Sequence, residues 1–302
     1  MFTSSDGRLR PLWAFVLSAL LSVGAFLSAG YAASAIAGDH VLRFETVFRP
    51  VLAVLLLAIF SWLLSVGNHI EDHRIAAQGL PLSPGWVEQF ALGCGIGFLL
   101  VILAVLPVIV WGSMSLRTSF SWFNLGRAAI VLGVLISGSL AEELMFRGYP
   151  FQRLVEAIGP AGAIVVFSVL FGVVHLSNPA ASLWGLTVTV AIGVFLSVTY
   201  LRTRALWLPW GIHFAWNTVL GLMLGLPVSG LRLFNVAVHA TVKGPKWLTG
   251  GGYGIEASAP GALAVLVGLA IVWRLPLNRL ENPAVLLPPE NPVEPALPDV
   301  TN

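Results

Sequence analysis

Long, continuous runs of apolar residues dominate the chain, and short polar connectors separate them. The runs approach the ~20 residues that cross a hydrocarbon core of ~30 Å. They do not alternate between apolar and polar positions, so the pattern predicts helices rather than strands. We therefore predict an all-α fold, a polytopic membrane helix bundle with about eight transmembrane helices. Their approximate positions are residues 12–37, 50–66, 88–111, 125–157, 161–176, 182–200, 206–226 and 261–273.

Composition and domain organisation support this prediction. Hydrophobic residues make up 57% of the 302 positions and charged residues only 10%, whereas soluble domains carry about 25% charged residues. We predict one integral membrane helical domain at residues 1–275, with the candidate chemistry at about residues 125–256. A proline-rich tail at residues 276–302 is predicted to be disordered. The first apolar run is too long for a signal peptide and is predicted to be a retained helix.

Charge and cysteine usage exclude several classes of protein. The net charge is +2, and no basic stripe is present to bind phosphates, so nucleic acid is not an expected partner. The single cysteine, Cys94, excludes an intramolecular disulfide framework. With the N-terminus inside, nine Lys and Arg residues fall in inner segments and seven in outer segments. This small bias predicts a cytoplasmic N-terminus for a protein embedded in the lipid bilayer of the bacterial inner (cell) membrane.

Small residues mark places where helices approach closely. Gly93, Gly95 and Gly97 stand in the run at residues 88–111, and Gly221 and Gly225 have GxxxG spacing in the run at residues 206–226. Both groups predict helix packing.

Ionisable side chains within the apolar runs are the candidates for chemistry, because each costs ~2.5–3.5 kcal/mol on membrane-insertion scales. Glu143 and Arg147 are four residues apart on one helix face, with the acid first, which favours an ion pair. Glu142 lies about 100° away around the helix and is left free for chemistry. The alternative is that both glutamates lie on a solvated helix end outside the membrane.

A histidine follows on the next predicted helix. Gly159-Pro160 is a turn signal, and it predicts an antiparallel hairpin of residues 125–157 and 161–176. Glu142 and His175 lie at about equal distances from this turn and are expected at similar depth. A carboxylate and an imidazole within reach of one water form a general-base arrangement. Taken alone, His175 is more simply a core histidine.

A second histidine precedes an asparagine by one helical turn. His213 and Asn217 share one face near the start of the run at residues 206–226. Both side chains are able to donate hydrogen bonds to a developing oxyanion. Histidine also suits a metal site with asparagine in support, and the pair is equally compatible with a polar helix–helix contact.

Three motifs in this order resemble the CAAX prenyl protease and bacteriocin-processing (CPBP, Abi) family of intramembrane proteases. They are EExxxR at residues 142–147, FxxxH at residues 171–175 and HxxxN at residues 213–217. The glycine-rich segment Thr249–Glu256 is similar to one found in bacterial members. The resemblance covers about residues 125–256 and shows no departure from the three motifs.

The resemblance implies a role for each matching residue. Glu142 would activate the attacking water with His175 as its partner, and His213 and Asn217 would stabilise the oxyanion. Glu143 and Arg147 would support the site structurally. The family fold and activity imply a hydrolase that cleaves a peptide or lipidated protein substrate at the membrane.

The resemblance leaves the catalytic type open. A metalloprotease would use one divalent metal such as zinc, with Glu142, His175 and His213 as three ligands and an open position. A glutamate-type protease would use the same carboxylate without metal.

Two other functions compete with the protease. A catalytically silent scaffold or immunity protein of the same fold would be favoured by loss of any of the four catalytic residues, and all four are present. A proton-coupled transporter would also use Glu and His, but transporters often show inverted repeats, and none is apparent. A prenylated CaaX-type peptide, another membrane-associated peptide and a leader-bearing peptide fit the sequence equally well as substrates.

Overall fold

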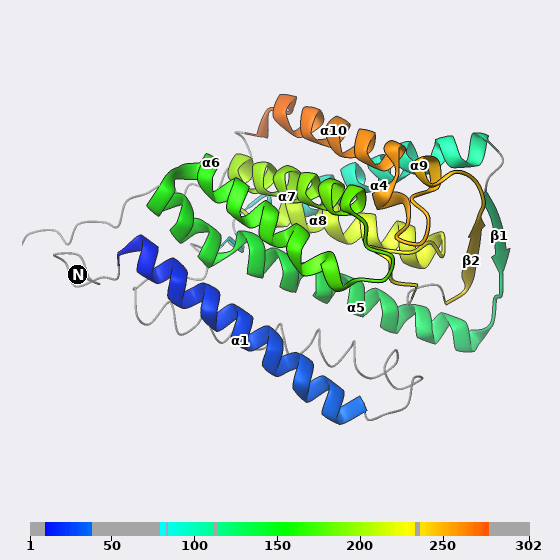
Figure 1. Ribbon diagram of the computed structural model, residues 1–302, viewed down its shortest axis with the longest axis horizontal. Coiled ribbons are helices and arrows are strands. Elements are labelled where there is room, and N and C mark those ends of the chain that lie inside the picture. Colours follow the sequence, from blue (N-terminus) through cyan, green and yellow to red (C-terminus); the bar gives the residue numbers. More distant parts are fainter. Residues whose placement is uncertain (1–9, 38–78, 83, 112–113, 233–235, 278–302) are drawn as a thin grey trace, which may run out of the picture.

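The fold is known from a computed structural model, which describes residues 10–37, 79–82, 84–111, 114–232 and 236–277. Most of these residues lie in long apolar helices that run side by side (Figure 1). The bounds of the elements are α1 Pro11–Ala37, α4 Trp86–Val110, β1 Met114–Thr118, α5 Trp122–Arg147, α6 Tyr149–Val174, η3 His175–Ser177, α7 Leu183–Thr203, α8 Trp207–Asn217, η4 Thr218–Met223, β2 Val238–Val242, α9 Lys246–Thr249, η5 Ile255–Ala257 and α10 Ala259–Arg274.

Serine residues begin three of the helices. The Oγ atoms of Ser121, Ser182 and Ser258 accept hydrogen bonds from backbone N–H groups at 3.1, 3.1 and 3.0 Å, at the starts of α5, α7 and α10. These N-caps satisfy backbone donors that have no partner within the helix. The sequence thus fixes where each of these helices starts.

The helical arrangement confirms an integral membrane helix bundle, while the count of eight spans stays a prediction. Within the described residues, four stretches are long and apolar enough to cross a membrane: Pro11–Ala32, Trp86–Val110, Trp122–Ser177 and Leu183–Thr203. The last described helix, α10, is shorter and also apolar. The predicted span at residues 50–66 and most of the tail at residues 276–302 lie outside the described residues.

The hairpin predicted around Gly159-Pro160 forms with one correction. Gly159 has φ +83° and ψ 164°, a non-helical conformation at which the chain bends. However, α5 ends at Arg147 rather than near Ala157, because Gly148 leaves the helical conformation. Figure 1 shows α6 returning alongside α5.

Glycines bring α4 and α8 into close contact. A Cβ atom at Gly97 would lie 2.5 Å from the carbonyl oxygen of Ile212, and one at Gly93 would overlap the carbonyl oxygen of Leu208. Gly211 is equally close to the carbonyl oxygen of Phe90 on α4. The predicted packing role is confirmed for Gly93 and Gly97, whereas Gly95 faces open space.

The prediction of helix packing for Gly221 and Gly225 was wrong for Gly225. The helix after Asn217 widens into the π-helical segment η4, which ends at Met223. Gly225 lies beyond it with φ +65°, in contact with the backbone of Val238 in β2. Gly225 therefore serves a turn, where its positive φ favours glycine.

The all-α membrane bundle fits the structure, and one small antiparallel ribbon accompanies the helices. Strands β1 and β2 pair with Met114 opposite Val242 and Thr118 opposite Val238. Figure 1 places the ribbon at one end of the helix bundle. The two short strands lie in predicted connectors. Apolar and polar residues alternate in both, as MSLRT and VHATV, but each segment is only five residues long.

Candidate active site

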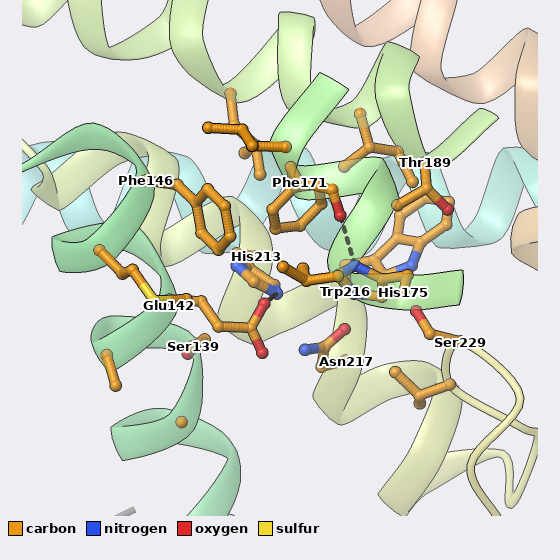
Figure 2. A pocket seen from close by; sticks show the side chains of 18 of the residues that line it. Ser139, Glu142, Phe146, Phe171, His175, Thr189, His213, Trp216, Asn217 and Ser229 are labelled. Atoms are coloured by element: carbon orange, nitrogen blue, oxygen red, sulfur yellow. Dashed lines mark hydrogen bonds and ion pairs between the residues drawn. The ribbon is translucent and has the colours of Figure 1, made fainter. Parts of the chain in front are cut away.

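A cavity of about 520 Å³ opens among the helices, and the predicted site residues line it. Most of its lining comes from α1, α5, α6, α7 and α8, and residues of α4, η3, η5, α10 and the connectors after η3 and η4 complete it. The lining is largely apolar, so a few polar groups stand out. Glu142, His175, His213 and Asn217 all line the cavity (Figure 2).

Glu143 links two helices beneath the cavity. Its Oε1 accepts a hydrogen bond from Arg147 Nη1 at 3.1 Å and one from His213 Nδ1 at 2.8 Å. The side chains of Glu143 and Arg147 are fully buried. The predicted ion pair is therefore present, and Glu143 also holds the histidine of α8.

Arg147 reaches further into the bundle. Its Nη2 donates to the carbonyl oxygen of Gly193 on α7 at 3.4 Å, and its guanidinium carbon lies 4.6 Å from the ring centroid of Phe171 on α6. Such cation–π contacts are stronger when water is excluded. Arg147 thereby joins α5 to α6 and α7.

Glu142 points away from this buried pair and into the cavity. Its side chain is 40% exposed, and its Oε2 lies 3.8 Å from His213 Nε2. Figure 2 shows the carboxylate facing the His213 ring. Adjacent residues of α5 thus have different surroundings, as the 100° rotation per residue predicts.

The two histidines have fixed ring orientations. His175 Nδ1 donates to the carbonyl oxygen of Phe171 at 2.6 Å, so its Nε2 is the acceptor in the neutral ring. His213 Nδ1 donates to the Glu143 carboxylate, and its Nε2 faces Glu142. In this ring Nε2 is able to donate only when the imidazole is protonated.

Phe171 packs at the centre of the site. Its ring lies 5.1 Å from the Phe146 ring at an interplanar angle of 90°, 4.8 Å from the His175 ring and 6.4 Å from the His213 ring. The first residue of the FxxxH motif thus contacts both histidines. This explains in packing terms why an aromatic residue stands there.

Asn217 is the last residue of α8 before the π-helical segment, and it lines the cavity. In the view of Figure 2, it lies between Glu142 on one side and Ser229 on the other. The structure therefore brings together all four residues predicted to be catalytic.

A metal is a separate question. Within the described part of the chain, no three side chains of His, Cys, Asp or Glu form a group arranged to hold an ion. Glu142, His175 and His213 thus share the cavity without forming a ready ligand set.

Sequence reasoning missed a polar group at one end of the cavity. The carboxylate of Glu256, in η5, accepts hydrogen bonds from Trp216 Nε1 at 3.1 Å and from Ser229 Oγ at 2.9 Å, and also from the backbone N–H of Ser229. All three residues line the cavity. Burial raises the pKa of the Glu256 carboxyl, while these hydrogen bonds and the nearby His175 oppose the rise. The one signal in the sequence was a carboxylate closing the glycine-rich segment.

The fold and the site define a class: an integral membrane helical protein with a carboxylate, two histidines and an amide in an apolar cavity. Residues 122–219 match the family model described as "Type II CAAX prenyl endopeptidase Rce1-like". The match covers the helices that carry all three motifs. This segment is thus similar to the CAAX prenyl endopeptidases, in agreement with the family resemblance of the three motifs.

A curated relative supports the same family. The chain is 33% identical over 103 residues to "Putative membrane peptidase YdiL" of Bacillus subtilis (strain 168). This match covers 33% of the present chain and 40% of that protein's length. No solved structure matches the chain.

Proposed function

We propose that this protein is an intramembrane endopeptidase that hydrolyses a peptide bond of a membrane-associated substrate with a water activated by Glu142. The proposal rests on the different surroundings of the two adjacent glutamates. Glu143 is buried in an ion pair with Arg147, while Glu142 faces the cavity at 40% exposure. The family match and the relative's name support peptidase activity.

The geometry supports the following steps. Glu142 takes a proton from water, and the resulting hydroxide adds to the carbonyl carbon of the scissile bond. His213, protonated and held by Glu143, donates from Nε2 to the oxyanion together with Asn217. Collapse of this intermediate breaks the C–N bond, and the proton held by Glu142 passes to the leaving amine. His175 orients the water with its Nε2.

The apolar cavity suits a substrate that enters from the membrane. Its lining accepts a prenylated (CaaX-type) chain, an apolar membrane segment or a leader-bearing peptide. We propose in addition an inner-membrane location with a cytoplasmic N-terminus and about eight spans. Because the three candidate ligands form no ready set, no step above is routed through a metal.

Cleavage of a peptide library by the purified, reconstituted protein tests the proposal. The library contains prenylated, membrane-anchored and leader-type peptides. Wild type is expected to cleave a subset of them, and Glu142→Gln to lower kcat by roughly 10²–10⁴-fold, the range for loss of a general base. The matched control is Glu156→Gln, because Glu156 is an exposed carboxylate paired with Arg153 outside the cavity.

Each result decides a separate point. Full activity of Glu142→Gln contradicts the role of Glu142 as base. Loss of cleavage on addition of a chelator, with recovery on adding back zinc, selects a metalloprotease. Cleavage unchanged by the chelator selects glutamate chemistry.

A further inference from the structure

Glu256 is a buried carboxylate that the proposed chemistry does not use. It is only 4% exposed, and it receives three hydrogen bonds from residues of two other segments. One oxygen binds Trp216 of α8, and the other binds both the N–H and the hydroxyl of Ser229. A single side chain therefore connects α8 and the turn at Ser229 to η5, which precedes α10.

Ser229 has a backbone conformation that needs such support. Its φ is +46°, in the left-handed region that residues with a side chain rarely adopt. The next residue, Gly230, donates to the carbonyl oxygen of Tyr253 at 2.7 Å, and the Tyr253 hydroxyl lies 3.1 Å from Thr189 Oγ1 on α7. The turn is thus bonded to the glycine-rich segment, and Ser229 lines the cavity.

Trp216 stands between the two residues proposed to stabilise the oxyanion. It follows His213 by three positions and precedes Asn217 directly, where α8 changes to the π-helical η4. A π-helix has i→i+5 hydrogen bonds, is rare in proteins and is frequent at functional sites. The hydrogen bond from the Trp216 indole to Glu256 fixes this turn from outside the helix.

We propose that Glu256 is a positioning residue: through Trp216 it orients Asn217 toward the substrate carbonyl, and through Ser229 it holds a turn that lines the cavity. The inference rests on the proposed function, because it assigns Asn217 to the oxyanion. Glu256 itself touches no reacting atom.

The bonding pattern specifies a carboxylate. An ionised carboxylate offers two acceptor oxygens and no donor, which suits three donors converging on it. A glutamine has one acceptor oxygen, and its NH₂ group would face a donor. Glu256→Gln therefore retains the hydrogen bonding to either Trp216 or Ser229, whereas Glu256→Ala loses it to both.

A double-mutant cycle with Asn217→Ala tests the proposal. Wild type, Glu256→Ala, Asn217→Ala and the double variant are compared by kcat and KM on the best-cleaved peptide of the library. Asn217→Ala alone is expected to lower kcat by roughly 10²–10³-fold, the cost of one oxyanion donor. Glu256→Ala is expected to lower kcat by roughly tenfold at nearly unchanged KM, and to add little to Asn217→Ala, because both act through the same group. Glu256→Gln is expected to fall between wild type and Glu256→Ala.

The alternative role gives a different result. If Glu256 only stabilised the fold, Glu256→Ala would lower the active fraction by the same factor in both backgrounds. Multiplicative losses therefore overturn the proposal, as does full activity of Glu256→Ala. Glu156→Ala serves as the control for removal of a carboxylate outside the cavity.

Hydrogen–deuterium exchange separates this proposal from the proposed function. The Ser229 amide donates to a buried carboxylate, so peptides covering residues 226–232 are expected to exchange slowly in wild type and faster in Glu256→Ala. Glu156→Ala is expected to leave this exchange unchanged. If no peptide is cleaved by wild type, the proposed function fails, and the exchange result still decides whether Glu256 holds the turn. Unchanged exchange in Glu256→Ala overturns the proposal even if cleavage is observed.

Discussion

At the scale of single residues, the two adjacent glutamates have opposite surroundings. Glu143 is fully buried and neutralised by Arg147 and His213, whereas Glu142 is partly exposed to the cavity. Helical rotation alone separates them. A substitution at each position should therefore change a different property of the protein.

Glu143→Ala is predicted to lower stability. It leaves the buried Arg147 guanidinium without its carboxylate, which costs about 3–5 kcal/mol for a buried pair. Thermal unfolding of the purified protein, followed by intrinsic fluorescence, is expected to show a lower Tm. Glu142→Ala is the paired control and should unfold near the wild-type Tm, since it removes a carboxylate that faces the cavity. Normal stability of Glu143→Ala together with lost cleavage would show that the roles of the two glutamates are exchanged.

At the scale of helices, the contact of α4 with α8 depends on the absence of side chains. Gly93 and Gly97 on α4 meet the carbonyl oxygens of α8 directly, and α8 carries His213 and Asn217. Backbones that approach this closely gain dispersion energy in lipid, where no hydrophobic drive brings helices together. The glycines therefore set the distance at which the site is held.

Gly97→Ala is predicted to destabilise the protein by about 1–3 kcal/mol, the usual cost of overpacking. The added Cβ atom would lie 2.5 Å from a backbone oxygen that has no rotamer to change. Gly95→Ala is the matched control, because it lies on the same helix and its Cβ atom would meet nothing within 4 Å. Thermal unfolding is expected to show a lower Tm for Gly97→Ala than for Gly95→Ala. Equal Tm values for the two variants would argue against close packing as the cause.

The glycines and the three motifs show what a sequence alone reveals about these helices. Apolar runs of sufficient length predicted the helices, and the i,i+4 spacing predicted the Glu143–Arg147 ion pair. The break at Gly148 was missed, although a glycine followed closely by Pro150 is a signal for the end of one helix and the start of the next. The bonds from Trp216 and Ser229 to Glu256 were also missed. They join a helix, a turn and a connector, and no periodic spacing relates their positions. The β1–β2 ribbon was missed for the same reason, since its strands are far apart in sequence.

At the scale of the whole molecule, the apolar stretch Trp122–Ser177 sets the topology around the site. Its 56 residues would extend for ~84 Å as one helix at ~1.5 Å per residue. A hydrocarbon core is only ~30 Å thick. The stretch must therefore turn back, and the non-helical Gly159 marks the place. Glu142 before this bend and His175 after it line one cavity as a result.

Cysteine labelling from either side of the membrane tests this double crossing. In a Cys94→Ala background, single cysteines replace Ser119, Ala161 and Ser177, all of which are exposed at or near the ends of α5 and α6. We expect a membrane-impermeant maleimide to reach Ser119→Cys and Ser177→Cys from one side and Ala161→Cys from the other. With a cytoplasmic N-terminus, Ala161→Cys is the one labelled from the cytoplasm. The opposite assignment would reverse the orientation but keep the double crossing. Labelling of all three from the same side would contradict the double crossing, and with it the matched depth of Glu142 and His175 on which the general-base arrangement depends.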